Sequence, residues 1–283
     1  MSSYRIFTFS YPFFISFSNN NFYANAFCMS KTICVTNQKG GVGKTTTAIN
    51  LSAALAVSEK KTLLVDCDPQ ANATTGLGID KTRLENSLYH GLIGERDLAD
   101  IIVDTEIDTL KLIPSRVELI GFEVEMMAES ESESALRRFI GGARDSFEYI
   151  IIDCPPSLSL LTVNALTASD FMLVPLQCEF YALEGVGQLI HTMNRIRESF
   201  NPVLEIAGIL LTMFDKRTNL SHQVAEDAER HFKDLVFSAR IPRNIRLSEA
   251  PSFGKPILLY DAVSAGAQSY FELARELISR SAI

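Results

Sequence analysis

The feature that most constrains this chain is a glycine-rich octapeptide with two lysines, Lys39-Gly40-Gly41-Val42-Gly43-Lys44-Thr45-Thr46. It follows an apolar run that predicts a strand at 33–35, and it precedes a segment with helical periodicity at 48–57. A strand, a glycine turn ending in Lys-Thr and a helix make up the arrangement of a phosphate-binding loop. The glycines let backbone N–H groups close around a polyphosphate, and the helix N-terminus adds unpaired donors. We therefore expect all eight residues to bind a nucleotide.

Three side chains of this loop have distinct expected roles. Lys44 would reach the β- and γ-phosphates, and the Thr45 hydroxyl would be a ligand of Mg²⁺. Lys39 stands at the front of the loop, where an ordinary glycine turn needs no lysine, and this makes the motif more specific. ATP and Mg²⁺ are the expected cofactors.

Carboxylates follow two other predicted strands. The strand at 62–66 ends in Asp66-Cys67-Asp68-Pro69-Gln70, and the strand at 149–153 ends in Asp153-Cys154-Pro155-Pro156. An apolar strand ending in Asp is typical of a Walker B element, whose carboxylate binds Mg²⁺ directly or through water. Of Asp66 and Asp68, one carboxylate would hold a water near a γ-phosphate and the other would approach the metal. The alternative for that pair is a solvated loop with an Asp capping a helix at Asn72.

Short apolar runs alternate with helical stretches from residue 31 onward. This pattern predicts a doubly wound α/β fold, a mostly parallel sheet with helices on both faces. The expected strands are 32–36, 62–66, 110–113, 149–153, 171–175, 206–213 and 236–239. The expected helices are 44–59, 117–127, 134–145, 160–168, 183–198, 220–232 and 265–280. Ligands of such sheets bind at the carboxyl ends of the strands, where all of the motifs above fall.

Charge and cysteine content narrow the class of protein. A net charge of −8 argues against a chain coated in basic residues, so nucleic-acid binding would need a local patch, assembled by oligomerisation. The five cysteines form no C-x-x-C pair. We interpret them as buried thiols in a reducing compartment rather than as ligands of a metal or cluster.

The first 28 residues differ from the rest of the chain. They hold seven of the 18 phenylalanines and one charged residue, Arg5. Ala24-Asn25-Ala26 gives them a weak likeness to a signal peptide, but Pro12 and several serines interrupt the apolar stretch. They contain no run of about 18 apolar residues that would span a membrane. We favour Met29 as the natural start, with 1–28 a mis-assigned start or a disordered tail and 29–283 a single domain.

Several motifs in this order make the chain similar to the ParA/Soj family of chromosome and plasmid partition ATPases. These proteins belong to the deviant Walker A class, which also includes MinD. The motifs are the octapeptide at 39–46, VDCDPQANAT at 65–74, IDCPPSL at 152–158, PLQCEFYALEG at 175–185 and IPRNIRLSEAP at 241–251. The resemblance covers residues 31 to about 280.

The resemblance implies specific roles for the site residues. Lys39 is the signature lysine, which crosses a dimer interface to the ATP of the partner, and it joins Lys44 and Asp68 as a catalytic residue. Asp68 would position the attacking water. By this resemblance, Thr45, Asp66 and Asp153 would support the Mg²⁺ ion. Pro242 and Arg243 would contact the adenine end of ATP.

The resemblance also implies DNA binding without sequence preference. Arg217 and Arg246 match positions that the family uses for that contact. Neighbouring cations would widen the patch, namely Lys216, Arg240, Arg243 and Lys255. The alternative for any one of these residues is an ordinary solvated surface cation.

The function implied by the resemblance is an ATP-dependent DNA-partition switch in the cytoplasm, on the nucleoid. The protein would dimerise with ATP, bind DNA, and hydrolyse ATP when a ParB-like centromere-binding protein stimulates it, without stable membrane association. One alternative is a MinD-like membrane-cycling ATPase, which would need a C-terminal amphipathic helix with a basic face. The residues at 272–283 mix both signs of charge instead. Another alternative is a metabolic or cluster-carrying ATPase on the same scaffold.

Overall fold

The computed structural model describes residues 30–126, 129, 131–179 and 182–280. The expectations for residues 1–28 and for a start at Met29 lie outside the described residues and stay predictions.

Eight strands of the described chain form one sheet. They are β1 (Lys31–Val35), β2 (Thr62–Asp66), β3 (Val103–Asp104), β4 (Leu110–Ile113), β5 (Tyr149–Asp153), β6 (Phe171–Gln177), β7 (Glu205–Phe214) and β8 (Val236–Pro242). Their order across the sheet is β3-β4-β2-β5-β1-β6-β7-β8. All neighbours pair in parallel except β3 and β4, which are antiparallel. The predicted parallel sheet is therefore confirmed, with one short edge strand added.

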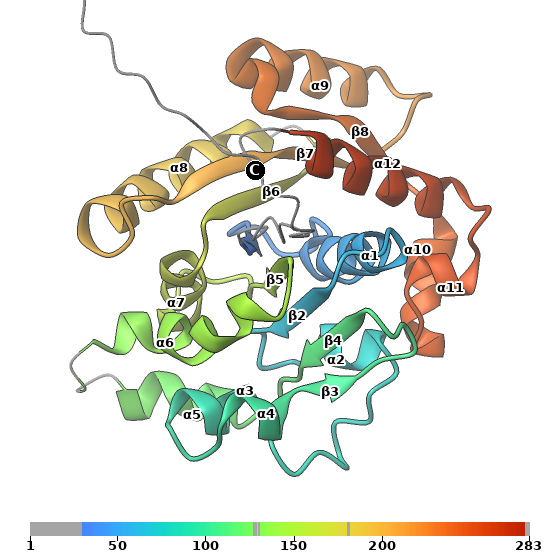
Figure 1. The fold of residues 1–283 in the computed structure, drawn as a ribbon. Helices are drawn as coiled ribbons and strands as arrows, with labels where there is room; N and C mark the ends of the chain where they lie inside the picture. The colour runs from blue at the N-terminus through green and yellow to red at the C-terminus, as the bar shows by residue number, and fades with distance from the viewer. Residues whose placement is uncertain (1–29, 127–128, 130, 180–181, 281–283) are drawn as a thin grey trace, which may run out of the picture.

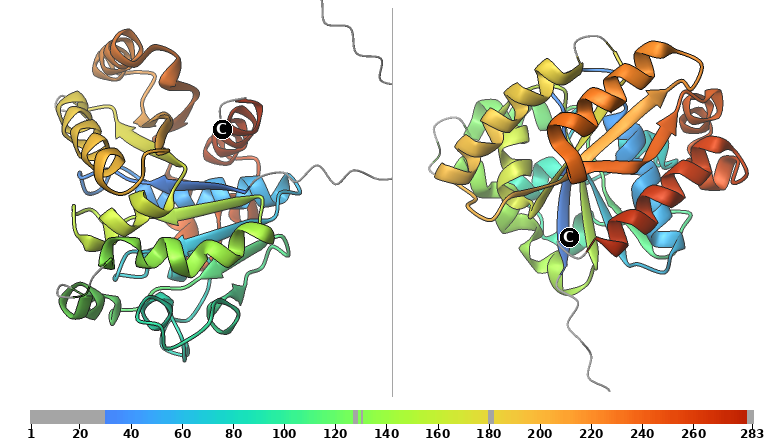
Figure 2. Two further views of the ribbon diagram at one scale, coloured as in Figure 1. Left: turned by 60° about the vertical axis from the view of Figure 1, so that its left-hand side comes forward. Right: turned by 90° about the horizontal axis from the view of Figure 1, so that it is seen from above.

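Helices cover both faces of this sheet, as predicted. They are α1 (Lys44–Val57), α2 (Asn72–Gly76), α3 (Leu88–Leu92), α4 (Leu98–Ile101), α5 (Leu119–Glu125), α6 (Ala135–Ile140), α7 (Leu160–Ala168), α8 (Ala182–Ser199), α9 (Asn219–Phe232), α10 (Ile245–Glu249), α11 (Ile257–Tyr260) and α12 (Ala265–Ser279). Figure 1 shows α1, α10, α11 and α12 on one side of the sheet and α5, α6 and α7 on the other. In both views of Figure 2, α8 and α9 lie across the sheet from α1 and α12. None of the described helices combines the length and apolar character that crossing a bilayer requires.

One predicted helix is divided in the structure. The segment expected at 134–145 forms α6 and then a 3-10 helix, η3 (Gly141–Asp145). Two consecutive glycines, Gly141 and Gly142, begin this tighter segment, and glycine weakens a helix because it gains most freedom on unfolding.

The core has two layers because successive strand residues point to opposite faces of the sheet. One layer packs beneath α1 and α12 and includes Ile33, Val35, Leu64 and Ile151. The other packs beneath α6, α7 and α9 and includes Cys34, Val65, Ile150 and Ile152. Burial of both faces explains why the strands read as continuous apolar runs. The cysteines among the described residues are all buried and unbridged, as expected, namely Cys34, Cys67, Cys154 and Cys178.

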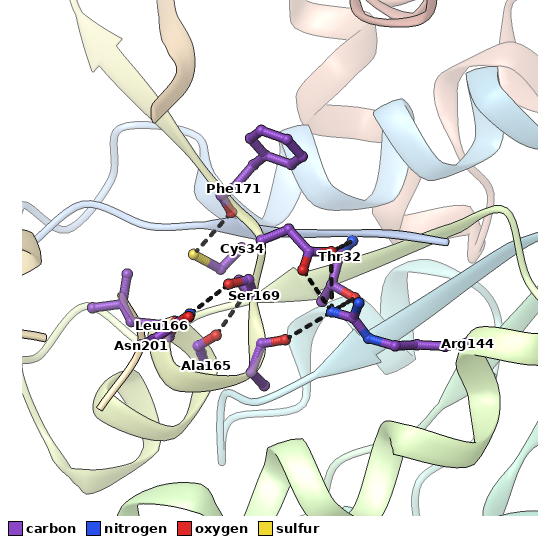
Figure 3. Close-up of polar contacts among 10 residues, drawn as sticks. Thr32, Cys34, Arg144, Ala165, Leu166, Ser169, Phe171 and Asn201 are labelled. Carbon is purple, nitrogen blue, oxygen red and sulfur yellow. Dashed lines mark hydrogen bonds and ion pairs between the residues drawn. The ribbon is translucent and has the colours of Figure 1, made fainter. Parts of the chain in front are cut away.

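Polar contacts tie together the amino ends of the central strands (Figure 3). Arg144 in η3 donates from Nη2 to both carboxylate oxygens of Asp170, at 2.9 and 3.0 Å, and to the Thr32 hydroxyl at 3.0 Å. The Thr32 backbone N–H donates to the same Asp170 at 2.8 Å. Nearby, Asn201 donates to the carbonyl oxygen of Ser169 at 2.6 Å. These contacts fix β1 and β6 at the end of the sheet opposite the phosphate-loop motif.

Two loops at the other end meet backbone to backbone at Gly78 and Gly254, which have φ of 81° and 65°. A Cβ on Gly254 would lie 2.6 Å from the Cα of Gly78. We expect Gly254→Ala to lower the free energy of unfolding by about 2–3 kcal/mol, because it combines left-handed strain with a backbone clash. Urea denaturation measures this loss. Gly142→Ala is the control, since a Cβ there meets no atom within 4 Å. An equal loss in both variants would contradict the account.

Candidate nucleotide-binding site

The glycine-rich segment forms a tight turn between β1 and α1. Gly41 and Gly43 have φ of 75° and 88°, a left-handed backbone that glycine adopts without strain. Helix α1 begins at Lys44, directly after this turn. The free N–H groups of the first helical turn therefore face the loop.

Neighbouring strands hold the loop in place. The Lys39 backbone N–H donates to Asn37 Oδ1 at 3.0 Å, and Asn37 Nδ2 donates to the carbonyl of Pro175 in β6 at 2.8 Å. The Thr212 hydroxyl in β7 donates to the carbonyl of Val42 at 2.9 Å. The loop is thus preorganised by contacts that the octapeptide alone does not reveal.

A cavity of about 300 Å³ opens at the carboxyl edge of the sheet, against this loop. Most of the predicted cofactor-binding residues line it, together with Asp68, whereas Val42 is buried inside the protein. The predicted lining residues are Gly40, Gly41, Gly43, Lys44, Thr45 and Thr46. Four other lining residues were not predicted, namely Gln70, Asn72, Pro156 and Met213. Each of these residues follows or ends a strand. The expectation that ligands bind at the carboxyl ends of the strands could therefore have identified them.

Lys44 places a largely buried cation in the wall of this cavity. Its Nζ donates to the Lys39 carbonyl at 2.9 Å. Burial lowers the pKa of Lys44, while the nearby Asp153, Cys154 and Asp68 act to raise that pKa. A cation that lacks most of its water shell in a glycine-lined cavity is suited to bind phosphate oxygens.

Asp153 at the end of β5 is fully buried, and neither of its carboxylate oxygens has a hydrogen bond within the described part of the chain. Burial raises the pKa of Asp153 well above its ordinary value, as does the adjacent Asp66, while the Thr45 hydroxyl acts in the opposite direction. An unpartnered buried carboxylate is costly and is stabilised by a cation. Carboxylate and hydroxyl oxygens are ligands that Mg²⁺ accepts, so Asp153 and Thr45 fit a magnesium ion.

The two carboxylates after β2 have different surroundings. Asp66 is fully buried and accepts hydrogen bonds from the Thr74 hydroxyl at 2.7 Å, the Thr74 N–H at 2.8 Å and the Asp68 N–H at 3.2 Å. Burial raises its pKa to about 6. Asp68 instead lines the cavity, and it accepts one hydrogen bond from the Gln70 N–H at 2.9 Å. Asp66 therefore shapes the loop, and Asp68 faces the space where a ligand would lie.

Lys39 does not line the cavity. Its ammonium group forms an ion pair with Glu179, which follows β6, and both side chains are 45% exposed. The Lys39 side chain therefore lies on the surface of the protein.

Pro242 and Arg243 line a second cavity of about 440 Å³, which shares Gly43, Thr46 and Met213 with the first. Part of its wall is apolar, with Ile241, Leu247 and Tyr270. Met213 has φ of 50°, an unusual conformation for a non-glycine residue, and it lines both cavities. The first, polar cavity suits a triphosphate, and the second, partly apolar cavity suits a nucleotide base.

Arg217 and Arg246 lie outside both cavities, after the ends of β7 and β8. Arg217 is 88% exposed and contacts Asp215 at 2.8 Å. Arg246 pairs with Glu249 at 3.0 Å and with Asp261 at 3.4 Å. A surface hollow brings Arg217 together with three of the other candidate cations, Lys216, Arg240 and Arg243.

The raised pKa values predict that the ligand-free protein loses stability as the pH rises. The pKa of Asp66 in the folded state is about 6, above an unfolded value of about 4, so its contribution is present at low pH and is lost as the pH rises through 6. Asp153 acts in the same direction. We expect Asp153→Asn to flatten this dependence and to raise stability at pH 7.5 by about 1–2 kcal/mol, because it removes a buried carboxylate whose oxygens accept no hydrogen bond among the described residues.

Thermal unfolding at pH 4.5 and pH 7.5 measures both effects. Asp234→Asn is the control, because it removes the same charge from an exposed position. If Asp153→Asn were no more stable than Asp234→Asn at pH 7.5, the free-energy cost assigned to the buried Asp153 carboxylate would be wrong.

Comparisons with known proteins agree with this geometry. A family model described as an AAA domain matches residues 30–206. The chromosome partitioning protein ParA of Myxococcus xanthus is 52% identical over 252 residues, which cover 89% of this chain and 89% of that protein. The sporulation initiation inhibitor protein Soj of Bacillus subtilis is 52% identical over 249 residues, which cover 88% of this chain and 98% of that protein.

A solved structure has the same fold. Cobyrinic acid a,c-diamide synthase from Mycobacterium smegmatis, with bound ADP and magnesium, gives a TM-score of 0.78 at 36% identity and covers 88% of this chain and 94% of that chain. The motifs identified in the sequence lie on a doubly wound sheet, and half of the aligned residues are identical to those of two curated relatives. The chain therefore belongs to the ParA/Soj family of chromosome-partitioning ATPases.

Proposed function

We propose that this ATPase is a DNA-partition switch that dimerises when it binds ATP and Mg²⁺. The ATP-bound dimer binds DNA without sequence preference, and a ParB-like centromere-binding protein resets it by stimulating hydrolysis. The observation that carries this proposal is the unpartnered, buried Asp153 next to Lys44 and Thr45 beneath a phosphate loop. The protein would act in the cytoplasm, on the nucleoid.

The roles of the site residues follow from their surroundings. Backbone N–H groups of the loop and the Lys44 ammonium would hold the phosphates, while Thr45 and Asp153 would hold Mg²⁺. When bound, Mg²⁺ would neutralise phosphate charge. Asp68 faces the cavity and would orient the attacking water. Asp66 would support the metal region by fixing the loop that carries Asp68. The ADP and magnesium bound to the M. smegmatis enzyme support this assignment.

Lys39 gives the site its dependence on a second copy. In the monomer its ammonium pairs with Glu179 at the surface. Exposed ion pairs of this kind contribute about 0–1 kcal/mol, so exchanging Glu179 for a phosphate costs little. A lysine supplied across the interface would offset charge on the partner's nucleotide as an arginine finger does.

DNA binding would use the cations after β7 and β8. Arg217 pairs with the partly buried Asp215 and Arg246 with the more exposed Glu249, and phosphates of DNA could replace these partners. A chain with a net charge of −8 needs several such contacts on one face for useful affinity. A dimer doubles that number, which accounts for a dependence on ATP.

A membrane-cycling role has less support. Such a role needs a C-terminal helix whose apolar face is free to enter a lipid surface. The apolar residues of α12 are instead packed in the core, among them Tyr270, Leu273 and Leu277.

We expect Arg217→Ala and Arg246→Ala each to weaken DNA binding about tenfold at low salt, because each loses a phosphate contact. ATP affinity should not change. Fluorescence anisotropy of a labelled duplex measures binding with Mg²⁺ and ATP, in an Asp68→Ala background that slows hydrolysis.

Arg83→Ala is the matched control, since Arg83 is 87% exposed and pairs with Asp80. Lys44→Ala should abolish the response to ATP. Wild-type affinity in both arginine variants, or equal DNA binding without ATP, would contradict the proposed function.

A further inference from the structure

Three apolar side chains on α5 and in the turn just before it are exposed to solvent. Val117, Ile120 and Val124 have exposed fractions of 64%, 56% and 71%. Their spacing of three and four residues places them on one side of a helical segment, which we call the α5 face. Leu119 and Phe122, between them in sequence, are fully buried. Figure 1 shows α5 at the outer edge of the molecule, where a partner can reach it.

The α5 face lies in an acidic stretch of the chain. Residues 116–133 contain six glutamates and one arginine, and so five of the eight net negative charges. The arginine is already paired, because Arg116 contacts Glu118 at 2.7 Å. Glu125 is held by the Tyr89 hydroxyl at 2.8 and 3.0 Å. Apolar side chains within acidic surroundings favour a partner whose apolar residues are flanked by cations.

The segment before α5 connects to the first acidic loop of the site. The Ser115 backbone N–H donates to the Thr74 hydroxyl at 3.0 Å, and both groups are buried. That hydroxyl in turn donates to Asp66 at 2.7 Å. A shift of α5 would therefore reach the loop that carries Asp68.

The other end of α5 connects to the loop after Asp153. Glu123 Oε1 accepts a hydrogen bond from the Leu161 N–H at 3.4 Å, in the first turn of α7. Residues 154–159 are all that separates α7 from β5. The α5 segment is thus linked through Thr74 to Asp66 and through Leu161 to the helix that follows Asp153.

We propose that the α5 face is the docking surface for the protein that stimulates hydrolysis, and that this partner presents an amphipathic helix with Lys or Arg beside its apolar stripe. The inference rests on the proposed function and specifies its regulatory surface. A second copy of the chain is a poor occupant, because a symmetric contact would set the same glutamates against each other. An anionic lipid surface is repelled for the same reason.

The test uses the purified ParB-like protein as the probe and the full chain with Mg²⁺ and ATP. The double variant Ile120→Ser/Val124→Ser should bind this probe at least tenfold more weakly in biolayer interferometry and lose stimulated hydrolysis. Its ATP-dependent DNA binding should stay within twofold of wild type, which shows that it folds. Val203→Ser/Val263→Ser is the matched control, because these valines are 67% and 88% exposed elsewhere.

A second variant tests the connection to the site. Glu123→Ala and Glu123→Gln lose the same negative charge and should bind the probe equally well, but Glu123→Ala should reach a lower stimulated rate, since it removes the acceptor for the Leu161 N–H. Glu123→Gln keeps an acceptor oxygen and should restore the rate. A purely structural role would weaken binding and stimulation together in both variants, and that result would overturn the connection.

The other outcomes are distinct. Full stimulation of Ile120→Ser/Val124→Ser overturns the docking surface and leaves the proposed function intact. A wild-type protein that neither binds the probe nor responds to it overturns both. Loss of ATP-dependent dimerisation in the double variant would make the α5 face a contact between copies, which also overturns the inference.

Discussion

Burial of opposite charges at one edge of the sheet is the constraint on which the rest of this structure depends. Lys44 begins α1 and Asp153 ends β5, and burial lowers the pKa of the lysine and raises that of the carboxylate. A folded protein keeps such groups at a cost in stability. Phosphates and a magnesium ion would supply the missing partners, so ligand binding and stability are coupled in this fold.

The surroundings of these charges explain how a surface event can reach them. Asp66 is held by Thr74, and Thr74 is held by the chain just before α5. The loop after Asp153 leads into α7, whose first turn contacts Glu123. The amino ends of β1 and β6 are instead fastened by Arg144 and Asp170. The contacts at the carboxyl edge therefore connect the α5 segment with the loops of the nucleotide site, which is where a switch between nucleotide states acts.

Much of the fold could be predicted from the sequence, because its signals are local. Continuous apolar runs predicted the parallel strands, and the glycine turn with Lys44 and Thr45 predicted the position of the cavity. The antiparallel pairing of β3 could not be predicted, because a two-residue edge strand has almost no pattern of its own. The different surroundings of Asp66 and Asp68 depend on Thr74, a residue with no distinctive signal. The left-handed Met213 and the exposed α5 face likewise depend on tertiary packing, which determines backbone conformation and exposure.

Analytical ultracentrifugation with Mg²⁺ and a non-hydrolysable ATP analogue tests the central claim most directly. The account predicts a dimer for the wild-type protein and a monomer without nucleotide. Lys39→Ala should bind the analogue and remain monomeric, because the lysine acts on the nucleotide of the partner. A wild-type protein that stays monomeric when saturated with the analogue, or a Lys39→Ala variant that dimerises as tightly as wild type, would contradict it.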